Sequence, residues 1–193
     1  MTTRLASILV VLAAFVATAS AQVSGLLRQD RGQNGLATTV AVFDGKTGLE
    51  LWGFGVDTKA PDLEIGKLFR VNSTKQQAAV LFGGYYAVWP VTGEHFAIPF
   101  AAWNTKSTIG FSGTMGYYQP LDNNFKMLFS DGMRVTTHVS GGYDAGLEAA
   151  FTAPYGSVPS YWFGPVISHA NWSVRVQANA ETHAIRLRTE LRF

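Results

Sequence analysis

Polar and apolar residues alternate along several segments of the chain, with the two-residue period of a β-strand. Residues 107–118 carry Ile109, Phe111 and Met115 at odd positions, and small polar residues or glycine at even positions. Residues 172–180 and 183–193 alternate in the same way. Each of these segments therefore predicts a strand with one apolar face and one polar face.

Short turn sequences such as Asp44-Gly45, Asp131-Gly132 and Gly141-Gly142 separate the segments. The predicted strands cover residues 36–43, 49–56, 77–89, 95–103, 107–118, 125–130, 133–141, 145–153, 161–170, 172–180 and 183–193, with a weaker one at 65–71. No amphipathic helix or domain boundary interrupts them. We predict one all-β domain over residues 35–193, preceded by a flexible N-terminal lead at residues 22–34.

The composition adds a second feature, because the chain has few charged residues. Only 15% of the 193 residues are charged, whereas 47% are hydrophobic and 13% aromatic. A soluble domain carries about 25% charged residues. The absence of cysteine excludes disulfides and thiolate metal sites. The net charge of +2 is too small to indicate nucleic-acid binding, and we expect no cofactor and no metal.

Residues 1–21 have the layout of a secretory signal peptide. Arg4 supplies the positive charge, Leu5 to Phe15 form an apolar run, and Ala19-Ser20-Ala21 fits the cleavage site. The rest of the chain has no apolar stretch long enough for a transmembrane helix. We therefore expect an exported protein.

Alternation of this kind fits two architectures. A soluble β-sandwich turns its apolar face inward, whereas a transmembrane barrel turns that face to lipid. Glycine and small polar residues on the polar face of residues 107–118 suit a crowded barrel interior. Aromatic residues near strand ends, among them Trp52, Phe54, Tyr85 and Trp172, fit the girdles of a membrane barrel. Segments 77–89 and 95–103 are apolar on both faces, so we expect them to pack against an internal plug or loop.

The end of the chain carries a resemblance to a known class. Ile185, Leu187, Leu191 and the terminal Phe193 alternate with polar residues, and this run resembles the C-terminal assembly signal of bacterial outer-membrane β-barrel proteins. The resemblance implies an antiparallel up-and-down barrel in the outer membrane of a Gram-negative cell. It also implies outer-membrane lipid and the barrel-assembly machinery as partners. It leaves the oligomeric state open.

Length then bounds the strand number. Transmembrane strands need about 9–11 residues each, and about 172 residues remain after the signal peptide. We predict eight strands, with ten or twelve as alternatives. An eight-stranded barrel is filled by its own side chains.

Charged residues on the polar faces form a predicted lumen charge cluster. Its members are Arg134, His138, Glu148, Arg175, Arg186, Arg188, Glu190 and Arg192. The cluster has two interpretations: a cationic constriction that favours anions, or a salt-bridge network that closes the lumen.

The function hypotheses follow from these features. The first is a structural or narrow, porin-like channel. The second is a lipid-modifying enzyme of the lipid A deacylase or acyltransferase type, for which His138, Ser140 and His169 are the weak catalytic candidates. The third is a secreted soluble β-sandwich that binds a ligand.

Overall fold

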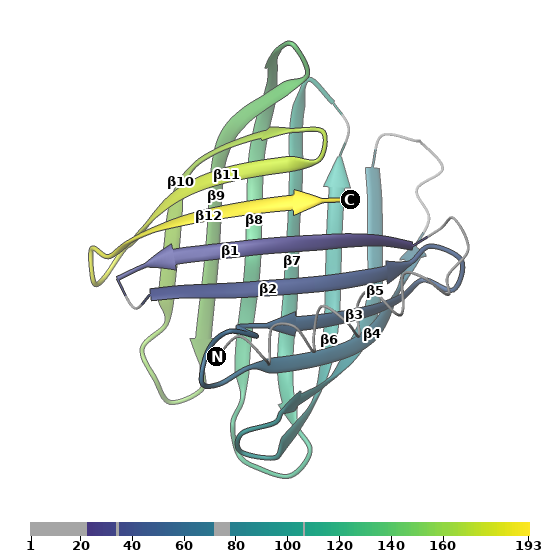
Figure 1. Cartoon of the computed structure of the whole chain (residues 1–193), viewed down its shortest axis with the longest axis vertical. Coiled ribbons are helices and arrows are strands. Elements are labelled where there is room, and N and C mark those ends of the chain that lie inside the picture. Colours follow the sequence, from purple (N-terminus) through teal and green to yellow (C-terminus); the bar gives the residue numbers. More distant parts are fainter. Residues whose placement is uncertain (1–22, 34, 72–77, 106) are drawn as a thin grey trace.

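A computed structural model describes residues 23–33, 35–71, 78–105 and 107–193. The predicted signal peptide lies outside these residues. The strands are β1 (Val23–Gly32), β2 (Gly35–Asp44), β3 (Leu49–Phe54), β4 (Asp62–Val71), β5 (Ala78–Trp89), β6 (Glu94–Thr105), β7 (Ile109–Pro120), β8 (Met127–Ser140), β9 (Tyr143–Pro154), β10 (Ser160–His169), β11 (Trp172–Asn179) and β12 (Ile185–Arg192). Each strand pairs antiparallel with its sequence neighbours, and β1 pairs with β12 to close the barrel (Figure 1).

The predicted up-and-down barrel is confirmed, and the sandwich alternative is wrong because a single sheet closes on itself. The preferred number of eight strands is also wrong, since the barrel has twelve. The connections between several strands are tight. Gly141 and Gly142, for example, both adopt positive φ between β8 and β9, a conformation that glycine enters without steric penalty. An eight-stranded barrel would have left some of the predicted strands in loops. In the structure these segments are strands of the barrel wall.

Residues 23–32 form β1, which corrects the prediction of a flexible lead over residues 22–34. Leu26 and Arg28 are buried inside the barrel, whereas Leu27 between them is exposed outside. The backbone pairs with β2 on one side and with β12 on the other. The segment looked aperiodic because polar residues occupy both of its faces. Arg28 and Asp30 find charged partners in the lumen, whereas Gln29 and Arg31 are exposed.

Residues 127–140 form the single strand β8, although the sequence predicted two strands separated by an Asp131-Gly132 turn. The register of β8 against β9 shifts between Ser130 and Met133, which marks a β-bulge. A bulge bends a strand and redirects side chains without ending it. Here it directs Asp131 into the lumen, where it meets arginines of β1 and β12.

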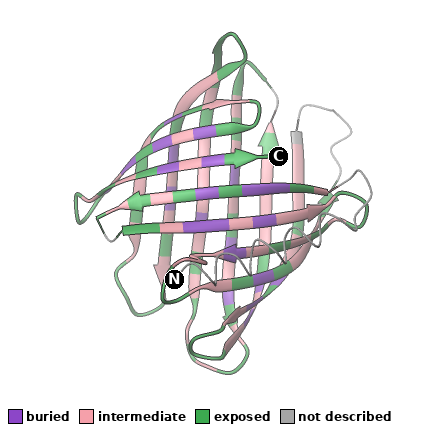
Figure 2. Ribbon diagram, viewed as in Figure 1, coloured by how far each residue is buried: buried purple, intermediate pink, exposed green. Residues whose placement is uncertain are grey.

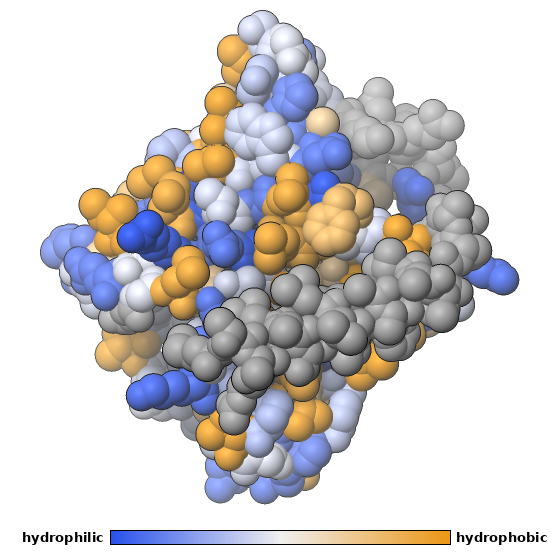
Figure 3. All heavy atoms as spheres, viewed as in Figure 1, coloured by the Kyte–Doolittle hydropathy of each residue, from blue (hydrophilic) through white to orange (hydrophobic). Residues whose placement is uncertain are grey.

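The outward positions of the strands are largely apolar and exposed. Ile109, Phe111, Val135, Leu147 and Phe163 are each about half exposed or more. Buried and exposed positions alternate along the front strands in Figure 2, and Figure 3 shows apolar patches beside hydrophilic ones on the visible part of the outer face. No helix among the described residues is long and apolar enough to cross a membrane.

The two segments that are apolar on both faces belong to β5 and β6. Their inward residues Tyr85, Ala87, Phe96 and Ile98 are buried with Tyr118 of β7 in one cluster. No plug lies within the described residues, and these side chains pack against one another inside the barrel. Trp89 and Phe96 also pack against Phe125 of the loop before β8, so the alternative of a packing loop is confirmed. The lumen thus has an aromatic side at β5–β7 and a charged side at β1, β11 and β12. In Figure 1 the strands β1 and β2 in front cross β7 and β8 behind at a steep angle.

The barrel seam continues one residue beyond β12. The Phe193 N–H donates to the Gly25 carbonyl oxygen at an N···O distance of 3.0 Å, and the Gly25 N–H donates to the Phe193 oxygen at 2.6 Å. The Phe193 ring lies over Gly25, where a Cβ atom would stand 2.5 Å from Cε2 of the ring.

Deletion of Phe193 is expected to lower the free energy of unfolding by about 2 kcal/mol, because two backbone hydrogen bonds of roughly 1 kcal/mol each are lost. Phe193→Ala keeps both hydrogen bonds and should have a smaller effect. Guanidinium unfolding of barrels folded into lipid vesicles measures both. Equal stability of the deletion variant and the parent would contradict this account of the seam.

Candidate functional site: the barrel lumen

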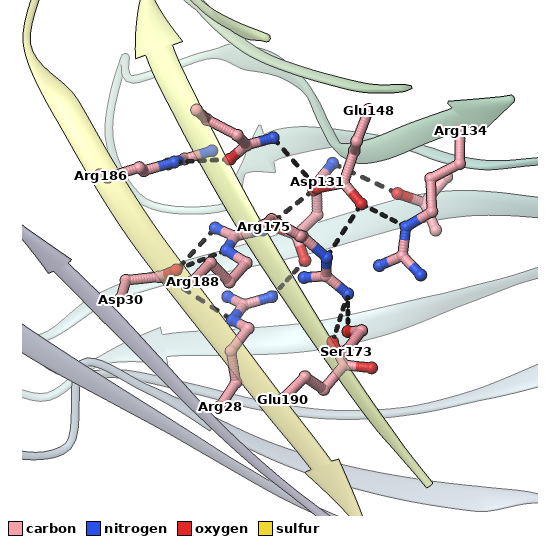
Figure 4. Close-up of polar contacts among 12 residues, drawn as sticks. Arg28, Asp30, Asp131, Arg134, Glu148, Ser173, Arg175, Arg186, Arg188 and Glu190 are labelled. Carbon is pink, nitrogen blue, oxygen red and sulfur yellow. Dashed lines mark hydrogen bonds and ion pairs between the residues drawn. The ribbon is translucent and has the colours of Figure 1, made fainter. Parts of the chain in front are cut away.

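Charged side chains from β1, β8, β9, β11 and β12 meet inside the barrel (Figure 4). We call this group the lumen network. It comprises Arg28, Asp30, Asp131, Arg134, Glu148, Arg175, Gln177, Arg186, Arg188 and Glu190. Strand register brings many of these residues together: Arg175 stands opposite Arg188, Asp30 opposite Arg188, and Arg134 opposite Glu148.

Glu148 is the centre of one half of the network and is only 1% exposed. Its carboxylate pairs with Arg134 and with Nε of Arg175 at 3.1 Å, and it accepts a hydrogen bond from Gln177 Nε2 at 3.1 Å. Arg175 also donates to Glu190 at 2.9 Å. Because Arg175 is itself 2% exposed, each buried charge here depends on the others for compensation.

Asp131 joins opposite parts of the wall in the other half of the network. Its carboxylate pairs with Arg28 of β1 and, at 3.0 Å, with Nη1 of Arg188 of β12. Asp30 binds the same Arg188 from β1. Strand β8 is not hydrogen-bonded to β1 or β12, so these ion pairs cross the lumen and do not follow the sheet.

Most residues of the predicted charge cluster belong to the lumen network. Arg134, Glu148, Arg175, Arg186, Arg188 and Glu190 belong to it, and Arg192 pairs with Glu190 at 2.9 Å near the end of β12. His138 lies apart, largely exposed, with Nδ1 at 3.3 Å from Asp144. The sequence reasoning missed Arg28, Asp30 and Asp131. The sequence carried little signal for them, because residues 28–31 are polar at every position and Asp131-Gly132 has the residues of a turn.

The three weak catalytic candidates do not meet. Ser140 is exposed at the end of β8, and no hydrogen bond among the described residues joins it to His138. His169 faces outward at the end of β10, and its ring packs 4.7 Å from that of Tyr143 and 6.1 Å from that of Trp172. No group of three residues that could hold a metal ion occurs in the described ranges.

A cavity of about 640 Å³ occupies the lumen beside the network. We call it the acidic–aromatic cavity, because Glu50, Asp62 and Glu64 line it together with aromatic rings. These rings belong to Phe43, Trp52, Phe54, Tyr85, Phe100, Tyr118 and Phe129. Trp52, Phe54 and Tyr85, expected at membrane girdles, therefore lie inside the barrel.

The carboxylates of this cavity are held by neutral donors. Tyr85 Oη donates to Glu50 at 2.6 Å, and Trp52 Nε1 donates to the same oxygen at 3.0 Å. Tyr118 Oη lies 2.5 Å from Asp62 Oδ2 and 2.6 Å from Glu64 Oε1. Within the described part of the chain, no ion pair is formed by any of the three acids, in contrast to the network beside them.

Comparison with known proteins identifies the fold. No protein-family model matches the chain, and no curated protein matches it. Among solved structures, the KdgM porin in complex with disordered oligogalacturonate superposes with a TM-score of 0.62 at 10% identity, over 88% of this chain and 98% of that one. The NanC porin gives 0.56 at 9% identity, over 89% and 98%. The outer membrane protein Omp33 of Acinetobacter baumannii gives 0.50 at 9% identity, over 89% and 98%.

These likenesses place the chain in a class of fold: it is a closed antiparallel barrel with the architecture of bacterial porins. The expected resemblance to outer-membrane barrels is confirmed at this level. Sequence identities of 9–10% show a shared fold and do not show a shared solute or cellular location.

The dependence of Arg134 and Arg175 on Glu148 predicts a large effect of one substitution. Glu148→Gln keeps the shape and removes the charge, and we expect it to lower the free energy of unfolding by about 3 kcal/mol, because two arginines lose their shared buried partner. Asp144→Asn, which breaks an exposed pair, should change it by less than about 1 kcal/mol. Guanidinium unfolding in vesicles compares the two. Similar small effects would show that the network adds little to stability.

Proposed function

We propose that this protein is a narrow, porin-like channel of the bacterial outer membrane. The observation that carries the proposal is the distribution of polarity on a closed barrel. Exposed apolar residues occupy the outer face, and buried charged residues occupy the inner face. A soluble protein hides apolar residues inside, whereas a barrel in lipid shows the reverse. The porin folds among its structural neighbours support the same proposal.

The lumen network sets the width of the proposed channel. Its ion pairs between Asp131 and the arginines of β1 and β12 fill one side of the cross-section, and the acidic–aromatic cavity occupies the other. Only small solutes or ions would pass beside the network. The channel is thus narrow by its own wall residues.

Charge pairing limits the anion preference of the channel. The KdgM neighbour is described in complex with an oligogalacturonate, which is an acidic sugar chain. In the present chain most of the lumen arginines pair with Asp30, Asp131, Glu148 or Glu190. We therefore propose weak charge selectivity in place of a strongly cationic constriction.

Location and assembly belong to the same proposal. Residues 1–21 would direct export, and the terminal strand would be read by the assembly machinery. Ile185, Leu187 and Leu191 face outward on β12 and are exposed, which supports their availability to lipid or to that machinery.

Asp131→Ala tests the proposed channel and its constriction together. The variant removes the cross-lumen carboxylate, so we expect the single-channel conductance in planar bilayers to rise severalfold over that of the parent. Asp144→Ala, at the exposed end of β9, is the matched control and should leave the conductance unchanged. A parent protein that inserts without any current would contradict the channel, and equal currents in both variants would contradict the constriction.

A further inference from the structure

The acidic–aromatic cavity is lined by three carboxyl groups that form no ion pair with the described residues. Glu64 is 5% exposed and lines the cavity, with Asp62 beside it on β4 and Glu50 opposite Gly66 in the strand pairing. All three acids lack an ion-pair partner in the described part of the chain. Arg28 and Arg192 also line the cavity, but Arg28 pairs with Asp30 and Asp131, and Arg192 pairs with Glu190. Buried carboxylates ordinarily pair with a cation or take up a proton, and neither arginine is paired with these three acids.

The carboxylates of Asp62 and Glu64 also have too few hydrogen-bond donors. Tyr118 is the shared donor to Asp62 and Glu64, yet a phenol carries one proton for its two carboxylate contacts. The second oxygen of Asp62, Oδ1, is buried and has no hydrogen-bond partner. Unsatisfied buried acceptors are rare in folded proteins. A positive charge placed in the cavity would offset this pair, whether or not it also donates a hydrogen bond.

The remaining walls of the cavity suit a particular kind of cation. Aromatic faces attract cations through the ring quadrupole, most strongly where water is excluded. Phe43 and Trp52 pack edge to face at 5.3 Å, and Trp52 stacks on Phe54 at 5.5 Å. The protein already places one cation on this surface, since the Arg28 guanidinium carbon lies 5.7 Å from the centre of the Phe54 ring.

We propose that the acidic–aromatic cavity is a binding site for a small organic cation, an amine or quaternary ammonium compound. The positive head would lie beside Asp62 and Glu64, with its alkyl groups against the aromatic rings. The volume of about 640 Å³ is ample for such a molecule. This inference rests on the proposed function, because a channel gives solutes access to the lumen.

Cations that hold their water tightly fit the site less well. Calcium requires six to eight oxygen ligands, and no suitable group of three metal-ligating residues lies in the described ranges. An aromatic wall offers a hydrated metal ion no lone pairs, whereas it offers a weakly hydrated ammonium group both contact area and favourable electrostatics.

The test uses choline against 3,3-dimethyl-1-butanol, a neutral molecule of the same shape. Each is titrated into the detergent-solubilised full barrel at constant ionic strength, and tryptophan fluorescence is recorded. We expect choline to give a saturable change and the neutral molecule none. The change should vanish in Trp52→Phe, which identifies the reporting ring. An equal response to both molecules, or none to either, would overturn the proposal.

Charge variants test the role of the carboxylates. Glu64→Gln and Asp62→Asn keep the shape of the wall, and each should raise the half-saturating choline concentration about tenfold or more. Glu181→Gln, in the exposed turn before β12, is the control and should bind as the parent does. Unchanged binding in both cavity variants would refute the site. The comparison of choline with its neutral isostere on the parent decides the question even if a variant fails to fold.

Conductance separates this inference from the function on which it rests. A parent that conducts in bilayers but ignores choline would retain the channel and lose the site. A parent that binds choline in detergent but never conducts would retain the site and lose the channel.

Discussion

The structure depends on the neutralisation of charge inside a closed wall. Arginines that line a closed lumen repel one another, and each buried cation needs an anion beside it. An unpaired charge in these low-dielectric surroundings would greatly lower the stability of the barrel. Asp131 meets this requirement by reaching Arg28 and Arg188 from another part of the barrel. The bulge in β8 exists at the position that makes this reach, so a local irregularity of one strand holds distant strands together.

The same requirement divides the interior into two unlike halves. Where carboxylates and arginines are matched, side chains fill the space and the lumen is closed to solutes. Where Glu50, Asp62 and Glu64 face aromatic rings, the space stays open, and these acids form no ion pair with the described residues. In the proposed channel, solute passage and cation recognition both belong to the second half, and the first half is the wall beside it. The outer face follows a simpler rule, since lipid contact requires only apolar side chains at alternating positions.

Much of the fold and part of the lumen network were predictable from the two-residue period of the sequence. It gave the barrel, most strand positions and the inward placement of Arg175, Arg188 and Glu190, because a strand fixes which neighbours share a face. The strand number was not predictable, since the period does not say whether a segment crosses the wall or forms a loop. Two local sequences were also ambiguous. Residues 28–31 are polar on both faces of β1, and Asp131-Gly132 has the residues of a turn but forms a bulge. Contacts across the lumen form only when the whole sheet closes, so no local sequence pattern predicts them.

The central claim is that ion pairs across the lumen couple walls that share no backbone hydrogen bonds. A double-mutant cycle between Arg28→Met and Asp131→Leu, measured by guanidinium unfolding in lipid vesicles, tests it most directly. The account predicts a coupling free energy above about 1.5 kcal/mol, the range of close charge pairs removed from water. Additive effects of the two substitutions, within about 0.5 kcal/mol, would contradict it.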